Sequence, residues 1–389
     1  MKKIFFTSII SAFISSPVFS GGWETGRLDN SFMYEDGNYG QFGVLSVNYD
    51  VGATIQHPLA PKHKMAKNQN RSAFAVKIGL GDFDLGLNRY HSGAIQLDGL
   101  AGGLEGCNPA TEAIALCSVV PSADVTIYST AYLARYSINE NISVFAGLTQ
   151  FALGDSTVTT IAGHYEVAAK TENVTVYGAA YEIPDIALKV EAVFQEETTT
   201  SLEASSSLSP LLPTTAIAGA NYTIPQTMTL NFQSGIAEDT LLFGSVHQQN
   251  WDTAQIIIPG NPNGINPVTF APDTPVSPVG SSFSDKTAYS IGVGRKISEN
   301  LSISLSYSRE DGSGPTTDDP FTLSDGSQGI TLGARYSMDN MTISAGYNYT
   351  TAGDVEVIHE AAPGVPSGLT ADYKDNTTSA IGVRVAFNF

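Results

Sequence analysis

Apolar and polar side chains alternate near the C-terminus with a period of two residues. Ile381, Val383, Val385, Phe387 and Phe389 fall on one face of this segment, and Gly382, Arg384, Ala386 and Asn388 fall on the other. Successive side chains of a β-strand point to opposite sides, so this is a strand with one apolar and one polar face. The alternation recurs along the chain, as expected for a barrel whose outer face meets lipid and whose inner face meets water.

This alternation predicts fourteen strands and therefore an all-β protein. They span residues 39–54, 71–80, 83–91, 125–137, 141–153, 173–183, 187–196, 226–236, 240–250, 286–297, 301–310, 329–337, 341–350 and 377–389. Most of these segments have the roughly 9–11 residues that a tilted membrane strand needs. An even number of strands returns both chain ends to the same side of the membrane.

The links between the strands alternate between tight turns and long loops. The tight turns include Gly81-Asp82, Pro184-Asp185 and Glu238-Asp239, and the long loops include 92–124, 197–225 and 251–285. Short periplasmic turns and long extracellular loops are typical of the Gram-negative outer membrane. We therefore predict a 14-stranded antiparallel transmembrane β-barrel. Its Ser-, Thr-, Pro- and Asn-rich loops 197–225 and 251–285 are predicted to be solvated surface.

The N-terminal residues 1–20 are predicted to be a secretory signal peptide. Lys2 and Lys3 precede an apolar run, and cleavage is expected after Ser20. A short plug-like segment, 21–38, then precedes the barrel at 39–389. No later stretch holds 18 consecutive apolar residues, so no transmembrane helix is predicted.

Composition narrows the functional classes. A formal net charge of −19 argues against nucleic acid as a partner. Cys107 and Cys117, the only cysteines, are predicted to form a disulfide in an oxidising compartment. The six histidines are scattered, so no metal site is predicted. Hydrolase, zinc-protease and phosphate-loop motifs are absent, so the sequence predicts neither an enzyme nor a cofactor.

Residues 225–251, PQTMTLNFQSGIAEDTLLFGSVHQQNW, resemble the FadL/TodX family of outer-membrane transporters for long-chain fatty acids and other hydrophobic compounds. Segments 131–151, 177–194, 287–308 and 329–354 are similar to other hairpins of that family. The resemblance implies a fourteen-stranded barrel closed by an N-terminal hatch. It also implies passive transport, with ligand leaving sideways through a gap at a kinked early strand. The glycines Gly79, Gly81, Gly86 and Gly93 suggest such a gap near residues 71–91.

The N-terminal segment departs from this family's pattern. Only residues 21–38 precede the first strand, about half the usual hatch, and Asn-Pro-Ala occurs only at 108–110 in a long loop. The predicted plug contacts are Trp23, Phe32, Met33 and Tyr34. A hatch this short leaves open a wider pore than the family pattern implies.

Apolar residues in loop 92–124 suggest a ligand-capture element, tied by the two cysteines. They are Ile95, Leu97, Leu100, Leu104, Ile114 and Leu116. Apolar side chains on a loop need cover, either from a ligand or from one another. Capture and a self-packed lid are both compatible with this pattern.

Inward-facing cations are candidates for a ligand carboxylate. They are Lys77, Lys189, Arg335 and Arg384, with Lys77 and Lys189 the better placed for a ligand. The alternative is a charge lattice that braces the barrel wall.

The sequence therefore predicts passive transport of hydrophobic small molecules across the outer membrane. A general diffusion porin for polar solutes, favoured by the short plug, and a non-transporting surface adhesin or phage receptor are the alternatives. The expected partners are a hydrophobic ligand, outer-membrane lipid and lipopolysaccharide. The barrel-assembly machinery is expected to recognise the C-terminal Phe389.

Overall fold

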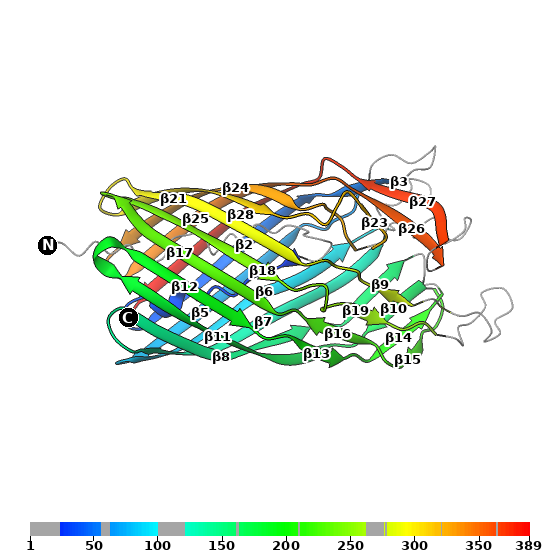
Figure 1. Cartoon of the computed structure of the whole chain (residues 1–389), viewed down its shortest axis with the longest axis horizontal. Coiled ribbons are helices and arrows are strands. Elements are labelled where there is room, and N and C mark those ends of the chain that lie inside the picture. Colours follow the sequence, from blue (N-terminus) through cyan, green and yellow to red (C-terminus); the bar gives the residue numbers. More distant parts are fainter. Residues whose placement is uncertain are drawn as a thin grey trace.

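Fourteen antiparallel strands close into one barrel, in which each strand pairs with its neighbours in the chain and the last pairs with the first (Figure 1). The computed structural model describes residues 24–55, 63–99, 121–160, 163–208, 211–261, 276, 278–319, 321–362 and 365–389. The barrel strands are β2 (Tyr39–Asp50), β5 (Gln69–Leu80), β6 (Phe83–Leu97), β7 (Ser122–Ser137), β8 (Ile142–Leu153), β11 (Lys170–Ile183), β12 (Leu188–Gln195), β17 (Thr227–Ala237), β18 (Thr240–Gln249), β21 (Lys286–Lys296), β22 (Leu301–Glu310), β24 (Ser327–Met338), β25 (Met341–Ala352) and β28 (Thr377–Asn388). All fourteen predicted strands are confirmed.

The outer face of the barrel is apolar along most of the strands. Its exposed large side chains include Phe42, Phe74, Leu85, Leu148, Leu230, Ile291, Leu305, Leu332 and Ile381, with Tyr132, Tyr177 and Tyr336 among them. Because the barrel closes, every barrel strand pairs with a neighbour on both sides and none is a free edge strand. This belt is the surface that the period-two pattern assigns to the bilayer.

Tight turns close one end of the barrel, at which the C-terminus lies in Figure 1. Gly81, Asp239 and Asp339 adopt positive φ angles of 77°, 57° and 34° in these turns, a conformation that glycine and aspartate tolerate. The Pro-Asp turn is the 3₁₀ element η4 (Pro184–Ile186), and η3 (Ser31–Tyr34) lies in the N-terminal segment. No helix in the described part of the chain is long and apolar enough to cross a membrane.

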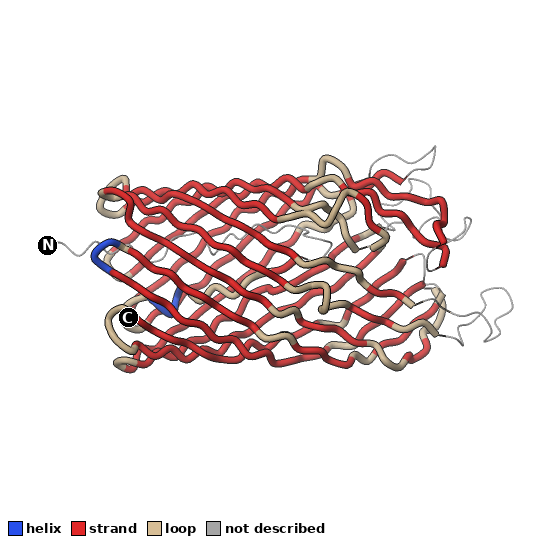
Figure 2. The backbone as a smooth tube through the Cα atoms, viewed as in Figure 1, coloured by secondary structure: helices blue, strands red, loops and turns tan. Residues whose placement is uncertain are grey.

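The long links at the opposite end form further strands (Figure 2). They are β3 (Gly52–Ile55), β4 (His63–Lys64), β9 (Ser156–Thr160), β10 (Gly163–Val167), β13 (Thr198–Ser201), β14 (Ala204–Ser207), β15 (Thr215–Ile217), β16 (Asn221–Ile224), β19 (Ile256–Ile258), β20 (Val279–Gly280), β23 (Thr316–Thr317), β26 (Val355–Ala362) and β27 (Val365–Tyr373). Leu202, Tyr222, Ile224 and Phe283 are buried there. The description of 197–225 and 251–285 as solvated surface is therefore wrong for these residues, because their short strands cover apolar side chains.

Strand β6 is longer than the alternation predicts and contains a bulge. Its pairing with β7 shifts between His91 and Gly93. Before the bulge the even-numbered Asp84 and Tyr90 face inward, and after it the odd-numbered Ile95 and Leu97 are buried. An extra residue inverts the period of two, so the sequence pattern ends at His91 although the strand continues to Leu97.

Candidate functional site: the lumen of the barrel

The inner face is apolar in the half of the barrel next to the long links. Val47, Tyr49, Ile95, Leu97 and Ile127 are buried there in one hydrophobic cluster. The same cluster includes Trp251, Phe283, Phe321, Leu323 and Tyr373 from the long links between the barrel strands. The part of the lumen next to the long links is therefore filled by apolar side chains that pack against one another.

A buried carboxylate ties these covering segments together. Asp319 accepts hydrogen bonds from the backbone N–H groups of Phe321 at 2.8 Å and Ser282 at 3.1 Å. Burial raises the pKa of Asp319 to about 6, although both hydrogen bonds oppose this rise. The cover thus excludes water from an acidic side chain, as expected for a packed structure.

Residues 24–38 cross the lumen below the apolar cluster. The backbone N–H of Gly26 donates to the carbonyl of Ser92 on β6 at 3.0 Å. Arg27 reaches Ser245 on β18, on the far side of the ring, with its two terminal nitrogens 3.3 and 3.4 Å from the hydroxyl oxygen. The N-terminal segment therefore lies inside the barrel and touches opposite walls.

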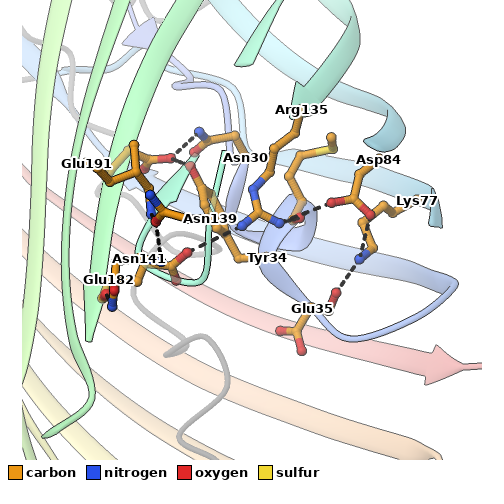
Figure 3. A network of polar contacts seen from close by, with 12 residues as sticks. Asn30, Tyr34, Glu35, Lys77, Asp84, Arg135, Asn139, Asn141, Glu182 and Glu191 are labelled. Atoms are coloured by element: carbon orange, nitrogen blue, oxygen red, sulfur yellow. Dashed lines mark hydrogen bonds and ion pairs between the residues drawn. The ribbon is translucent and has the colours of Figure 1, made fainter. Parts of the chain in front are cut away.

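Glu191, on the inner face of β12, anchors this segment (Figure 3). Asn30 Nδ2 and the Tyr34 hydroxyl donate to its Oε1 at 2.7 and 2.5 Å. Asn231 on β17 donates to Oε2 at 2.9 Å. Glu191 is only 2% exposed, so each of these charge-assisted hydrogen bonds is shielded from water.

A chain of ion pairs joins the segment to the neighbouring wall. Lys77 Nζ lies 3.3 Å from Asp84 Oδ1, and Arg135 Nη1 lies 3.0 Å from Asp84 Oδ2. Arg135 also pairs with Glu182 at 3.3 Å and donates to the Met33 carbonyl at 3.1 Å. Figure 3 shows these groups converging around the 3₁₀ turn of the segment.

Aromatic and apolar contacts also hold residues 24–38 against the barrel wall. Lys189 Nζ lies 3.0 Å from the centre of the Tyr34 ring, and the Arg135 guanidinium lies 4.4 Å from it. Phe32 and Met33 are buried, in one cluster with Leu133 and Val176 of the wall.

Gly86 on β6 leaves the space that Met33 and Phe32 occupy. A Cβ at this position would lie 2.1 Å from Met33 Sδ and 2.8 Å from the Phe32 ring. We expect Gly86→Ala to weaken the packing of residues 24–38 against the wall by a free energy of about 1–3 kcal/mol, because the added methyl group forces Met33 and Phe32 to move. Faster hydrogen exchange at the backbone N–H of Met33, which donates to the Asn30 carbonyl at 3.0 Å, would report this change.

Gly79 on β5 provides the matched control for this substitution. Its Cβ would meet Asp84 Oδ1 and the Gly37 carbonyl at 3.4 Å, an ordinary contact distance. Gly79→Ala is therefore expected to leave exchange at Met33 unchanged. Equal exchange in the Gly86→Ala and wild-type proteins would contradict the tight fit.

The wall is interrupted where β5 and β6 diverge. Their pairing runs from Leu80 and Phe83 up to Phe74 and Arg89. It resumes only at the isolated bridge between Ala66, ahead of β5, and Leu97 at the end of β6. The next part of β6 pairs instead with β1 (Glu24–Thr25), in which Thr25 lies opposite Gly93. At Gly93 and Ala94, the N-terminal segment therefore takes the place of β5 beside β6.

Comparison with solved structures identifies the fold. A crystal structure of a Pseudomonas aeruginosa FadL homologue matches with a TM-score of 0.70 at 12% sequence identity, over 92% of each chain. The chain has the FadL-type barrel fold. The Pseudomonas putida toluene transporter TodX matches with a TM-score of 0.59 at 11% identity over 91% of each chain. The Ralstonia pickettii toluene transporter TbuX matches with 0.55 at 10% identity, over 91% of this chain and 90% of that one. No protein-family model and no curated protein matches the sequence.

In this FadL-type barrel the sequence-predicted cations have different surroundings. Lys77 is paired with Asp84 and donates to the Glu35 carbonyl, and Lys189 lies against Tyr34. Arg384 lies 3.6 Å from Asp29 and donates to Gln41 at 3.2 Å. Arg335 is half-buried on the inner face of β24. These contacts favour the bracing interpretation for Lys77 and Arg384.

The predicted capture residues divide into two groups. Ile95 and Leu97 belong to β6 and face the lumen, so their assignment to a loop is corrected by the bulge described above. Leu100, Leu104, Ile114 and Leu116, together with Cys107 and Cys117, lie outside the described residues, so the disulfide stays a prediction. Trp23 also lies outside them, whereas Phe32, Met33 and Tyr34 make the contacts described above.

Sequence reasoning missed Arg27 and Arg135 as luminal cations. Arg135 had a usable signal, since it alternates with the outward Tyr132 and Tyr136 on β7. Arg27 had none, because residues 24–38 have no regular period and their side chains are directed only by the surrounding wall.

Proposed function

We propose that this FadL-type barrel carries hydrophobic small molecules passively across the outer membrane. The observation that carries the proposal is the lining of the lumen, which is apolar beneath the long links and ends at the N-terminal segment. A hydrophobic compound gains free energy by leaving water for the apolar wall. Ile95 and Leu97, at the end of β6, belong to this apolar lining and to segment 92–124. We infer that this segment takes part in capturing the ligand.

We infer that the ligand leaves sideways between β5 and β6. Straight passage would lead through residues 24–38 and the ion pairs of Lys77, Asp84 and Arg135. Passage along this route would take water away from these charges, and a hydrophobic molecule could not replace the lost hydrogen bonds. The interrupted β5–β6 pairing, closed by the two-residue strand β1, provides an alternative that leads towards lipid.

The apolar lining and the names of the fold relatives support a hydrophobic ligand class. TodX and TbuX are named as toluene transporters. We propose long-chain fatty acids or aromatic hydrocarbons of comparable hydrophobicity as substrates here. We also infer that outer-membrane lipid and lipopolysaccharide surround the outer belt.

Uptake and conductance measured together test this function. Cells that express the protein are expected to take up labelled palmitate or toluene several-fold faster than cells without it. The purified protein in planar bilayers is expected to show no steady ion current, since residues 24–38 cross the lumen. A large steady current without faster uptake would overturn the proposal in favour of a diffusion porin.

A further inference from the structure

Arg89 faces outward from β6, at the point where the apolar belt of this strand ends. Phe83 and Leu85 are 53% and 49% exposed on the same face, and Leu87 follows them. Arg89 is the next outward residue and is itself exposed. It lies on the side of the belt towards the long links, which mark the extracellular end of an outer-membrane barrel. Its guanidinium therefore reaches the head groups of the outer leaflet, because a cation next to hydrocarbon extends to the interface.

The wall leaves the charge of Arg89 without a counter-ion. Its Nη1 donates to the Thr130 hydroxyl on β7 at 3.3 Å, and its guanidinium carbon lies 5.4 Å from the centre of the Tyr128 ring. No carboxylate in the described part of the chain forms an ion pair with it, although the chain carries 38 Asp and Glu residues. The remaining guanidinium N–H groups have no acceptor among the described residues and are available to a ligand.

Uncharged polar side chains extend this site along the neighbouring strands. Arg89 lies opposite Thr130, Thr130 lies opposite Gln150 of β8, and Gln150 lies opposite Asn173 of β11. Residues that face each other across paired strands lie on the same side of the sheet, so these four form one row on the outer wall. The row joins one cation to hydroxyl and amide groups and holds no acidic side chain. Such a set of donors suits a phosphate, whose oxygens accept several hydrogen bonds at once.

We propose that Arg89, Thr130 and Gln150 bind a phosphate group of lipopolysaccharide in the outer leaflet, with its acyl chains against Phe74 and Leu87. Charge complementarity and continuity with the lipid-facing belt carry this proposal. It rests on the inference that lipopolysaccharide surrounds the belt, and it is independent of what the lumen transports. The bound lipid would lie at the margin of the β5–β6 interruption, because Phe74 and Arg89 form the last pair below it.

Binding of purified lipid A to the detergent-solubilised barrel tests the site. Native mass spectrometry gives the dissociation constants of phosphorylated and dephosphorylated lipid A for the wild-type, Arg89→Gln, Arg89→Lys and Arg309→Gln proteins. Heat-modifiable gel mobility confirms that each barrel is folded. Arg309 on β22 is the matched control, because it is also an exposed outward cation at the end of the belt but lies 3.8 Å from Asp311.

Arg89→Gln is expected to weaken the binding of phosphorylated lipid A about tenfold, because hydrogen bonds between two charged groups are lost. The wild-type protein is expected to bind dephosphorylated lipid A equally weakly. Arg89→Lys keeps the charge but not the forked geometry, so its affinity should lie between those of the wild type and Arg89→Gln. Arg309→Gln is expected to bind as the wild type does. Equimolar inorganic phosphate is expected to leave lipid A bound, since it lacks the acyl chains.

The site is overturned if the wild-type protein binds both forms of lipid A equally, or if Arg89→Gln binds the phosphorylated form as tightly as the wild type. In either case lipopolysaccharide still surrounds the belt, without a phosphate site at Arg89. Displacement of lipid A by equimolar inorganic phosphate would also overturn it, in favour of a site for the free anion. If the wild-type protein binds no lipid A at all, the inference about the surrounding lipid fails together with the site.

Discussion

Replacing Glu191 with alanine is expected to release residues 24–38 from the wall and open the lumen to ions. The substitution removes the acceptor for Asn30, Tyr34 and Asn231, at 2.7, 2.5 and 2.9 Å. Three donors then remain in a site that is almost closed to water. Losing a buried, hydrogen-bonded charge of this kind costs about 3–5 kcal/mol, enough to shift the segment from mainly bound to substantially released.

Single-channel recording in planar bilayers measures the opening directly. The Glu191→Ala protein is expected to show a steady current that the wild-type protein lacks, and cells that express it are expected to become sensitive to large polar antibiotics. Glu191→Gln should lie between the two, since its amide oxygen still accepts from Tyr34. Glu299→Ala, in an exposed tight turn, is the control for the loss of one acidic side chain. A Glu191→Ala barrel that stays silent would show that the other contacts hold the segment without this carboxylate.

Crosslinking β1 to β6 is expected to stop uptake of hydrophobic compounds almost completely. Thr25 lies opposite Gly93, next to the pair that carries the Gly26–Ser92 hydrogen bond, so the two residues form a non-hydrogen-bonded pair. Facing Cα atoms in such a pair are about 4.5 Å apart, within the range that a disulfide spans. The bridge in Thr25→Cys/Gly93→Cys would keep the segment across the β5–β6 interruption, through which we propose the ligand leaves.

The crosslink is made in a background in which Cys107 and Cys117 are replaced by serine, so that only one pair can form. Reduction with dithiothreitol is expected to restore uptake. Each single-cysteine variant is expected to transport as fast as the protein in which only Cys107 and Cys117 are replaced. Undiminished uptake by fully crosslinked protein would rule out the β5–β6 interruption as the exit.

The strands and their inner and outer faces were predictable from the sequence, because both depend on a local repeat. Side chains two residues apart share a face wherever the pairing is regular, so Lys77 and Glu191 could be placed inside without a structure. The same reasoning failed at His91, where one extra residue reversed the faces of β6. It also failed for residues 24–38, which have no period that could show their direction.

What the sequence by itself determined is therefore a closed wall of fourteen strands with an apolar outside, whereas its inside is polar only in the half next to the tight turns. The tertiary structure alone decided which luminal charges neutralise one another, that Arg27 reaches Ser245 across the ring, and that β1 replaces β5 beside Gly93 and Ala94 of β6. Strand alternation is encoded between near neighbours in the chain. Contacts across a lumen join residues that are distant in sequence, and only closure of the ring brings them together.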